Sequence, residues 1–386
     1  MKREVWLDYL RVLACLMVMV IHSTEPFYLG GDGALILTPT DAFWVSIFEA
    51  LCRCCVPVFL VASAYLQFPL HYSTGEFFRR RAVRILVPML IWTVVYALVW
   101  GEPVENFKGL LLNFNYAAGH LWFVYMLVGV YLIMPLLSPW AEKVSRKELE
   151  IYLGVWLVTT LFPFVRELAG GEAPLIQAAD GLPAPALFPL WGEASWNAFG
   201  TFYYVSGFIG YLLLGLYLRR FVDNRPWVKL TGCSLFLLGF AAIFSGLLRR
   251  FSDTSDLFPI TGSLGTAVAW ETPINFCGLP VVMTTVGIIL LFRSSLANRR
   301  EEGFFYRKCI LPLSKAGYGM YLIHMLVLGN LSPLLRSALK TGSEGVLGSW
   351  TTPVEILLTA LASFAIVGVM AVLIQRIPKA GKYLMG

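Results

Sequence analysis

Charged residues are scarce in this chain. Of its 386 residues, 14% are charged and 58% are hydrophobic, whereas about 25% of the residues of soluble domains are charged. This composition argues against soluble domains and predicts a polytopic membrane protein. Aromatic residues make up 15% of the chain, which suits a protein that crosses two membrane–water interfaces. A disordered or collagenous chain is excluded, and nucleic-acid binding is not expected.

Paired cysteines, a cleavage signal and repeats are also lacking. The seven cysteines are an odd number and most lie in or beside apolar runs, so no disulfide framework is expected. The cluster 52–55 has no second pair at finger-like spacing, so we expect small buried hydrophobic side chains and no metal site. The first apolar run contains Asp8 and Arg11 and is followed by no small-x-small site, so we expect it to stay in the mature protein. We expect residues 1–386 to form a single transmembrane domain.

Apolar runs of about 20 residues, the length that crosses a bilayer core of about 30 Å, recur along the chain. We therefore predict an all-α membrane protein of about ten transmembrane helices. The predicted spans are 5–25, 42–67, 82–100, 120–139, 149–166, 201–218, 230–248, 274–292, 312–335 and 353–375.

Lys and Arg residues are unevenly divided between the two sets of connecting segments. Most lie in one set, which includes the basic segment 79–84. The opposite set holds only Lys108, Arg166, Arg249, Arg250, Arg336 and Lys340. By the positive-inside rule, this distribution predicts a protein of the inner (plasma) membrane with both termini in the cytoplasm.

The longest predicted outer segment is 167–200. It is either a lid or acceptor platform, or an ordinary irregular connection. Its Trp191 and Trp196 are candidates for stacking on a sugar, and the alternative is that they anchor the chain at the interface.

The first span carries ionisable residues inside the expected hydrocarbon zone. Roughly ten residues separate Arg11 from His22, and a helix of that length rises only about 15 Å. At least one of the two therefore lies within the bilayer core, where such residues normally face a protein interior or a water-filled cavity. Eleven steps of about 100° place both side chains on one face of the helix, about 16 Å apart.

Each of these two residues has an acidic residue one helical turn away. Asp8 precedes Arg11 by three positions, and Glu25 follows His22 by three. We expect an Asp8–Arg11 ion pair, and we expect Glu25 to orient His22. A histidine on an apolar helix is often only structural, and this alternative applies to each histidine in a span.

The basic segment before the third span contains Arg79, Arg80, Arg81 and Arg84. Arg81 and Arg84 are one turn apart, a spacing that suits a phosphate-rich ligand at the membrane surface. The alternative is that the segment sets topology and contacts anionic lipid.

Several motifs together resemble the acyltransferase-3 family of integral-membrane O-acyltransferases, most closely the enterobacterial-common-antigen O-acetyltransferase type. They keep the family's order from about residue 4 to 376. One departure is Ala64, where members usually have glycine. The motifs are Arg11-x10-His22 preceded by Asp8, Val56-Pro57-x-Phe59…Ser63-Ala64-Tyr65, Arg81…Arg84…Pro88, His120-Leu-Trp122-Phe123 and Ser314…Gly319-Met-Tyr321-Leu-x-His324.

The resemblance implies about ten helices around a central cavity, with acetyl-CoA entering from the cytoplasm and a glycan or lipid-linked sugar acceptor approaching from outside. It also implies that His22 is catalytic and that Arg11 belongs to the same essential motif. Acyl transfer needs a base near the acceptor and cations for the donor's phosphates. His22 suits the base with Glu25 beside it, and Arg11, Arg81 and Arg84 suit the phosphates. Predicted substrate contacts are Ser63, Tyr65, His120, Trp122, Tyr321 and His324.

The resemblance leaves the acceptor and the choice between acetyl and succinyl open, and three further questions stay open at this point. Whether His22 acts as a base or itself carries the acyl group is one of them. A transporter or flippase that uses Arg11, His22 and Glu25 as a proton relay is another, although the halves 1–190 and 200–386 share no visible inverted repeat. The last is a structural or sensing membrane protein without a site, against which the polar stripe of the first span argues.

Overall fold

The computed structural model describes residues 3–30, 33–100, 116–168, 192, 199–223, 225–296, 303–341 and 345–386. The expectations placed on Trp191, Trp196 and most of the segment 167–200 lie outside these residues.

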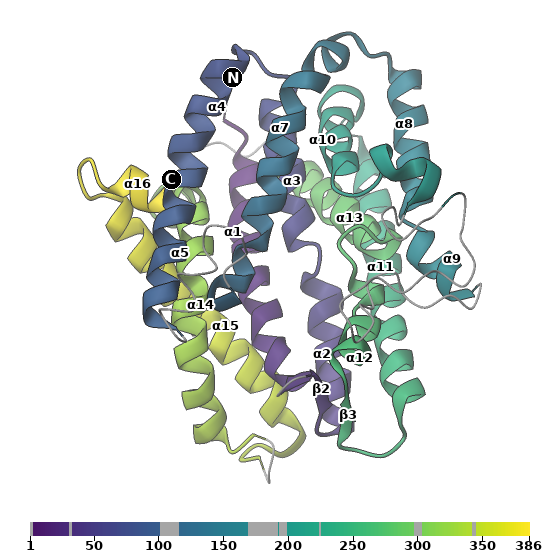
Figure 1. Cartoon of the computed structure of the whole chain (residues 1–386), viewed down its shortest axis with the longest axis vertical. Coiled ribbons are helices and arrows are strands. Elements are labelled where there is room, and N and C mark those ends of the chain that lie inside the picture. The colour runs from purple at the N-terminus through teal and green to yellow at the C-terminus, as the bar shows by residue number, and fades with distance from the viewer. Residues whose placement is uncertain are drawn as a thin grey trace.

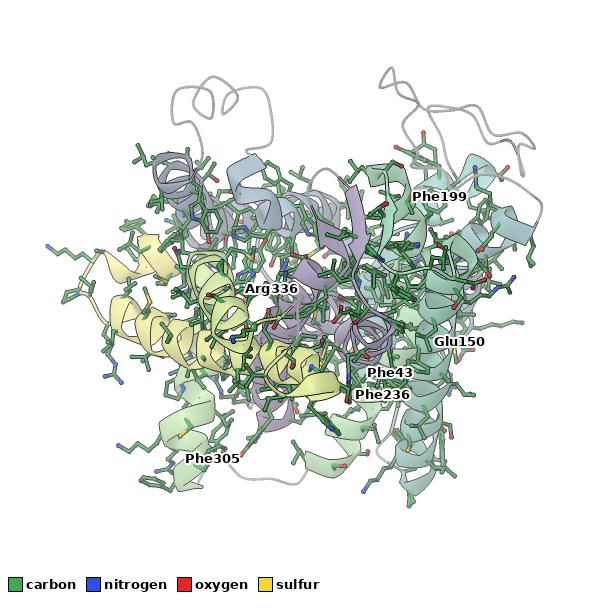
Figure 2. The ribbon with its side chains drawn as sticks, turned by 90° about the horizontal axis from the view of Figure 1, so that it is seen from below. Phe43, Glu150, Phe199, Phe236, Phe305 and Arg336 are labelled. Carbon is green, nitrogen blue, oxygen red and sulfur yellow. The ribbon has the colours of Figure 1, made fainter. Side chains whose placement is uncertain are left out.

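Helix α1 (Val5–Thr24) lies inside the helical bundle. Most of its residues are buried, and it packs against α2, α3, α14 and α15. In the view from below, the purple N-terminal helices lie between the yellow C-terminal helices on one side and the teal middle helices on the other (Figure 2). The short 3-10 helix η1 (Glu25–Phe27), with Pro26 in its first turn, follows α1 directly. The ionisable residues of α1 are therefore held within the protein.

The second predicted span consists of two helices, α2 (Pro39–Cys52) and α3 (Cys55–Gln67). The break falls at Arg53 and Cys54. Pro57 explains it, because proline has no N–H to bond the carbonyl group four residues earlier, at Arg53. The break therefore puts a buried arginine at the centre of the span.

Two further helices begin with a π-helical turn. Helix α4 (Thr74–Arg81) continues through η2 (Ala82–Leu86) into α5 (Val87–Val99). In the same way, η6 (Tyr306–Ile310) leads into α14 (Leu311–Leu339). In each case a proline, Pro88 or Pro312, follows the turn and leaves one earlier carbonyl without its usual partner.

The other helical elements complete the bundle in Figure 1. They are η3 (Tyr116–Leu121), α7 (Trp122–Lys143), α8 (Arg146–Thr159), α9 (Phe162–Leu168), η4 (Gly200–Val205), α10 (Ile209–Phe221), α11 (Pro226–Thr254), α12 (Leu264–Trp270), η5 (Thr272–Ile274), α13 (Leu279–Leu296), η7 (Gly348–Trp350), α15 (Thr351–Gln375) and α16 (Gly381–Met385).

Nine helical segments of the described chain are long and apolar enough to cross a membrane. The protein is therefore a multi-pass, helical membrane protein. The predicted span 201–218 differs from the others, because it consists of η4 and of α10, a helix of 13 residues that rises only about 20 Å.

Helix α10 packs closely against α3. A Cβ atom added at Gly215 would lie 2.6 Å from the Cβ of Ala64, so only glycine fits at position 215. The chain thus has alanine on α3 and glycine at the facing position of α10.

A small antiparallel sheet, which the sequence did not predict, joins two distant segments. Its strands are β1 (Leu29–Gly30), β2 (Gly33–Ile36) and β3 (Ile260–Gly262), in the order β1-β2-β3. Ala34 pairs with Leu29 on one side and with Gly262 on the other. The sheet therefore brings the segment before α12 to the end of α1.

The bundle has two distinct ends along the long axis of Figure 1. At one end, Ser314 donates a hydrogen bond to Asp8 (2.6 Å) and Tyr318 donates to the carbonyl of Ile85 (2.8 Å). The starts of α1 and α14 therefore lie beside the basic segment 79–84, and we call this the basic end. The sheet lies at the opposite end, which we call the sheet end.

Candidate functional site

A cavity of about 800 Å³ is lined by residues of α1, α3, α7, η5 and α14. Its volume lies within the range of about 300–1,000 Å³ that is usual for ligand pockets. Both Arg11 and His22 line it, which confirms that they share one face of α1. The other predicted site residues in the lining are Glu25, Ser63, Arg81, His120, Trp122 and Tyr321.

The contact expected between His22 and Glu25 is present. Nδ1 of His22 lies 2.8 Å from Oε1 of Glu25. Because a carboxylate only accepts hydrogen bonds, Nδ1 carries the proton and Nε2 of the neutral ring has a free lone pair. No described residue forms a hydrogen bond to Nε2. A histidine held by a carboxylate in this tautomer is arranged as a general base.

Three histidines from distant parts of the chain lie together. The ring of His324 lies 5.1 Å from that of His22 and 5.0 Å from that of His120, between centroids. Nδ1 of His324 donates to the carbonyl of Tyr321 (2.5 Å), and the Tyr321 hydroxyl donates to the carbonyl of His120 (2.5 Å). His324 is fully buried and does not line the cavity. It therefore supports the cavity wall from behind.

The predicted Asp8–Arg11 ion pair is absent. Asp8 is only 2% exposed, and its two oxygens accept hydrogen bonds from Arg3 (2.7 Å), Tyr306 (2.7 Å) and Ser314 (2.6 Å). The prediction was wrong because these donors occupy both carboxylate oxygens. The hydrogen bonds to Asp8 also raise the pKa of Arg3. Arg11 therefore forms no ion pair with a described residue, and Asp8 acts on it only through longer-range attraction.

Unpaired cations line the cavity toward the basic end. They are Arg11, Arg81 and Lys315, and none of them forms an ion pair with a described residue. The guanidinium of Arg81 lies 5.0 Å from the ring centroid of Tyr131, a cation–π distance. No carboxylate among the lining residues lies beside these cations, so this part of the cavity suits an anionic ligand.

The other arginines of the basic segment lie outside the cavity. Arg80 is exposed and pairs with Glu76 (2.5 Å). Arg84 is exposed and does not line the cavity. The structure therefore brings Arg81, but not Arg84, to the same cavity as Arg11.

Two of the predicted substrate contacts, Ser63 and Tyr65, lie in different places relative to the cavity. Ser63 lines the cavity and accepts a hydrogen bond from the amide of Gln67 (3.0 Å). Tyr65 lies outside the lining, where its ring packs edge-on against Trp6 at 5.3 Å. Direct contact with a ligand in this cavity is therefore open to Ser63 and not to Tyr65.

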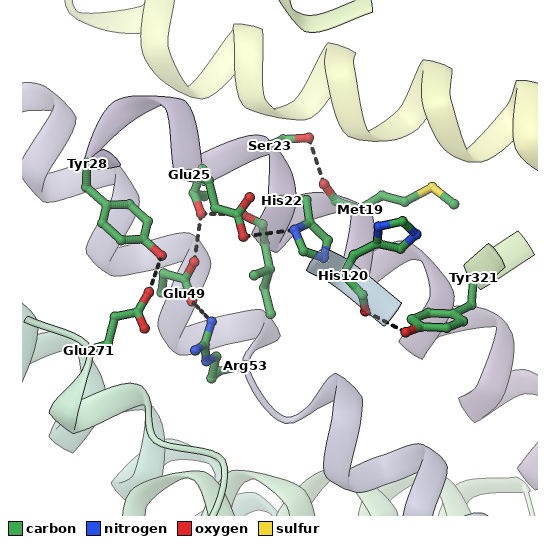
Figure 3. A network of polar contacts seen from close by, with 12 residues as sticks. Met19, His22, Ser23, Glu25, Tyr28, Glu49, Arg53, His120, Glu271 and Tyr321 are labelled. Atoms are coloured by element: carbon green, nitrogen blue, oxygen red, sulfur yellow. Dashed lines mark hydrogen bonds and ion pairs between the residues drawn. The ribbon is translucent and has the colours of Figure 1, made fainter. Parts of the chain in front are cut away.

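A polar cluster at the sheet end was missed by the sequence analysis (Figure 3). Glu49 is fully buried, accepts a hydrogen bond from Thr24 (2.7 Å) and pairs with Arg53 (3.4 Å). Glu271 accepts a hydrogen bond from the hydroxyl of Tyr28 (3.0 Å). Burial, assisted by Glu271, raises the pKa of Tyr28, so this hydroxyl stays a donor. The only signal in the sequence was an acid and a base four residues apart in an apolar span.

Arg53 connects this cluster to the aromatic wall of the cavity. Its Nε donates to the carbonyl of Ile274 (2.8 Å), and its guanidinium lies 4.3 Å from the ring centroid of Phe276. Phe276 in turn stacks on Trp122 at 5.4 Å. Arg53 therefore holds the segment after α12 against α2, and its contact with Phe276 lies next to the Phe276–Trp122 stack.

The chain matches a family model described as an acyltransferase domain over residues 4–372, which is nearly its whole length. The chain belongs to the acyltransferase-3 family. It is therefore a membrane acyltransferase, and the resemblance of its motifs to this family is confirmed. No curated protein and no solved structure matches the chain closely enough for comparison.

Proposed function

We propose that this acyltransferase is a transmembrane O-acetyltransferase of the inner membrane, formed by residues 1–386 as one domain. It moves acetyl from cytoplasmic acetyl-CoA to a hydroxyl of an extracytoplasmic glycan or glycolipid, as in the enterobacterial-common-antigen O-acetyltransferase type. The observation that carries the proposal is a single cavity lined both by unpaired cations and by the His22–Glu25 pair.

In this proposal the basic end and both termini face the cytoplasm, which the distribution of Lys and Arg supports. The phosphates of acetyl-CoA bind Arg11, Arg81 and Lys315, because phosphate groups favour cations that have no other partner. Arg84, exposed at the same end, is a further predicted contact for the nucleotide phosphates. The pantetheine arm then extends along α1 and brings the thioester to His22.

At His22 the acceptor hydroxyl gives its proton to Nε2 as its oxygen attacks the thioester carbonyl carbon. When the tetrahedral intermediate collapses, the C–S bond breaks and the departing thiolate takes the proton from His22. Glu25 stabilises the transient imidazolium through the Nδ1–H bond. An intermediate in which His22 carries the acetyl group is equally compatible with this geometry.

The remaining predicted residues have two kinds of role in this proposal. Ser63, His120, Trp122 and Tyr321 line the cavity and are proposed to contact the donor or the acceptor. His324 and Tyr65 do not line it, and they are proposed to act through their neighbours, His324 by supporting His22 and His120.

The proposal is tested with purified protein in liposomes, acetyl-labelled acetyl-CoA and a cell-envelope glycan fraction. We expect alkali-labile label on the glycan and release of one CoA for each acetyl ester formed. The alternative, a proton-coupled transporter or flippase that uses the Arg11/His22/Glu25 stripe, predicts movement of the sugar without acetyl-CoA and no ester. That result would contradict the proposed function.

A further inference from the structure

Glu271 is the one carboxylate in the cavity lining that lacks a nitrogen partner among the described residues. Its Oε1 accepts a hydrogen bond from the hydroxyl of Tyr28, and its Oε2 accepts none from the part of the chain that the structure describes. The other lining carboxylate, Glu25, is bonded to His22, and the buried Glu49 behind the wall faces Arg53. Glu271 therefore presents a free acceptor atom to the cavity, and the cation that interacts with its charge, Arg53, is already paired with Glu49.

The position of Glu271 relative to the proposed base is held by a short series of contacts. Tyr28 bonds Glu271 through its hydroxyl, and its backbone N–H donates to the carbonyl of Glu25 (3.1 Å). Glu25 in turn holds His22 (Figure 3). On the other side, Arg53 holds the carbonyl of Ile274, three residues after Glu271. Glu271 and His22 therefore belong to one rigid wall of the cavity.

Two further polar groups of the same cavity have no hydrogen-bond partner among the described residues. Nε2 of His120 is buried and has no hydrogen-bond partner among the described residues, and His120 is 8% exposed. Arg53, which bonds Ile274 and pairs with Glu49, also lines the cavity, and its Nη2 forms no hydrogen bond within the described chain. A buried nitrogen such as Nε2 of His120 is costly to leave unsatisfied. Nη2 of Arg53, a donor, and Oε2 of Glu271, an acceptor, are open to hydroxyl groups of a ligand.

We propose that Glu271 binds the acceptor and determines whether neutral, cationic or anionic sugars are accepted. Its carboxylate accepts hydrogen bonds from hydroxyl or ammonium groups on the ring that carries the reacting hydroxyl. A carboxylate or phosphate on that ring is repelled, because like charges at close range in a poorly solvated cavity are strongly unfavourable. The acceptor is therefore a neutral or amino sugar. This inference rests on the proposed function, because it assigns the acceptor of that reaction.

The test compares Glu271→Gln and Glu271→Asp with a matched control, Asp253→Asn. Asp253 is an exposed carboxylate on α11 that pairs with Arg249 at 3.3 Å, away from the cavity. The probes are the 4-nitrophenyl glycosides of glucose, glucosamine and glucuronic acid, each incubated with labelled acetyl-CoA and the full chain in liposomes. Binding of CoA to each variant confirms that the variant is folded.

We expect the wild-type protein to acetylate the glucoside and the glucosaminide and to disfavour the glucuronide. Glu271→Gln should raise the KM for the glucoside about ten-fold, the usual effect of losing a hydrogen bond to a charged group. It should also lower the ratio of kcat/KM for the glucoside to kcat/KM for the glucuronide. The KM for acetyl-CoA should stay within about two-fold of the wild-type value. The KM of Glu271→Asp for the glucoside should lie between those of the wild type and Glu271→Gln. The KM of Asp253→Asn should equal that of the wild type.

Two results overturn the inference: a wild-type protein that accepts the glucuronide as well as the glucoside, or a Glu271→Gln variant with unchanged KM and preference. If only native envelope glycans are acetylated, the rate on those glycans replaces the KM, and equal rates for Glu271→Gln and Asp253→Asn overturn it. Failure of the proposed function is distinct, because the wild-type protein would then form no ester on any acceptor.

Discussion

His22→Ala is expected to lower acetyl transfer by about one hundred- to ten-thousand-fold, the usual contribution of a positioned general base. The variant loses the Nε2 lone pair that is proposed to take the acceptor's proton, while the cations that are proposed to bind the donor are untouched. The affinity for CoA should therefore stay unchanged. The measurement is the rate of label transfer from acetyl-CoA at saturating donor, together with the dissociation constant for CoA.

Two further variants make this prediction specific. Glu25→Gln keeps the size of the side chain but removes the negative charge beside Nδ1 of His22, so it should lower the rate less than His22→Ala does. His71→Ala is the matched control, because His71 is exposed and lies outside the cavity. A His22→Ala protein that inserts correctly and keeps the rate of the His71→Ala protein would contradict the proposed mechanism.

Arg11→Ala is expected to raise the KM for acetyl-CoA about ten- to one hundred-fold, which corresponds to the loss of hydrogen bonds to a charged phosphate. The reason is that Arg11 lines the cavity and forms no ion pair with a described residue, since the oxygens of Asp8 are occupied by Arg3, Tyr306 and Ser314. Its charge is therefore available to a ligand. Donor titrations of the initial rate measure the effect.

The controls for Arg11 separate charge from position. Arg11→Lys keeps the cation and should restore part of the affinity, although lysine cannot form the same two-point contact. Arg80→Ala removes a cation of the basic segment that is already paired with Glu76, and it should leave the KM for acetyl-CoA unchanged. Equal KM values for Arg11→Ala and Arg80→Ala would rule out the proposed donor site.

The sequence could predict those parts of the site that depend on local helical geometry. His22 and Glu25 are one turn apart on a single helix, and Arg11 and His22 are a whole number of turns apart. Their contact and their shared face therefore follow from spacing alone. The helical membrane fold followed in the same way from the length of the apolar runs.

The rest of the site depends on contacts between distant segments, which spacing cannot indicate. Asp8 appeared to be the natural partner of Arg11, but its partners Tyr306 and Ser314 are 298 and 306 residues away along the chain. Glu271 reaches Tyr28 only because the small sheet joins segments that lie far apart in the sequence. The sequence alone therefore did not show which residues Asp8 and Glu271 contact.

The length of α10 was also mispredicted, for a different physical reason. The run 201–218 is as apolar as a membrane span, but a run of apolar residues does not show where a helix begins. In the structure the first part forms η4, and only Ile209–Phe221 is α-helical. Most residues of α10 are buried inside the bundle, and this burial accounts for the apolar character of the helix.

The central claim is that one cavity connects a cytoplasmic donor end to an acceptor end on the opposite face. It is tested most directly with sealed membrane vesicles of defined orientation and membrane-impermeant, acetyl-labelled acetyl-CoA added outside. Inside-out vesicles should acquire label on glycans within the lumen, and right-side-out vesicles should acquire none. Labelling only in right-side-out vesicles, or label confined to the face on which acetyl-CoA was added, would contradict the account.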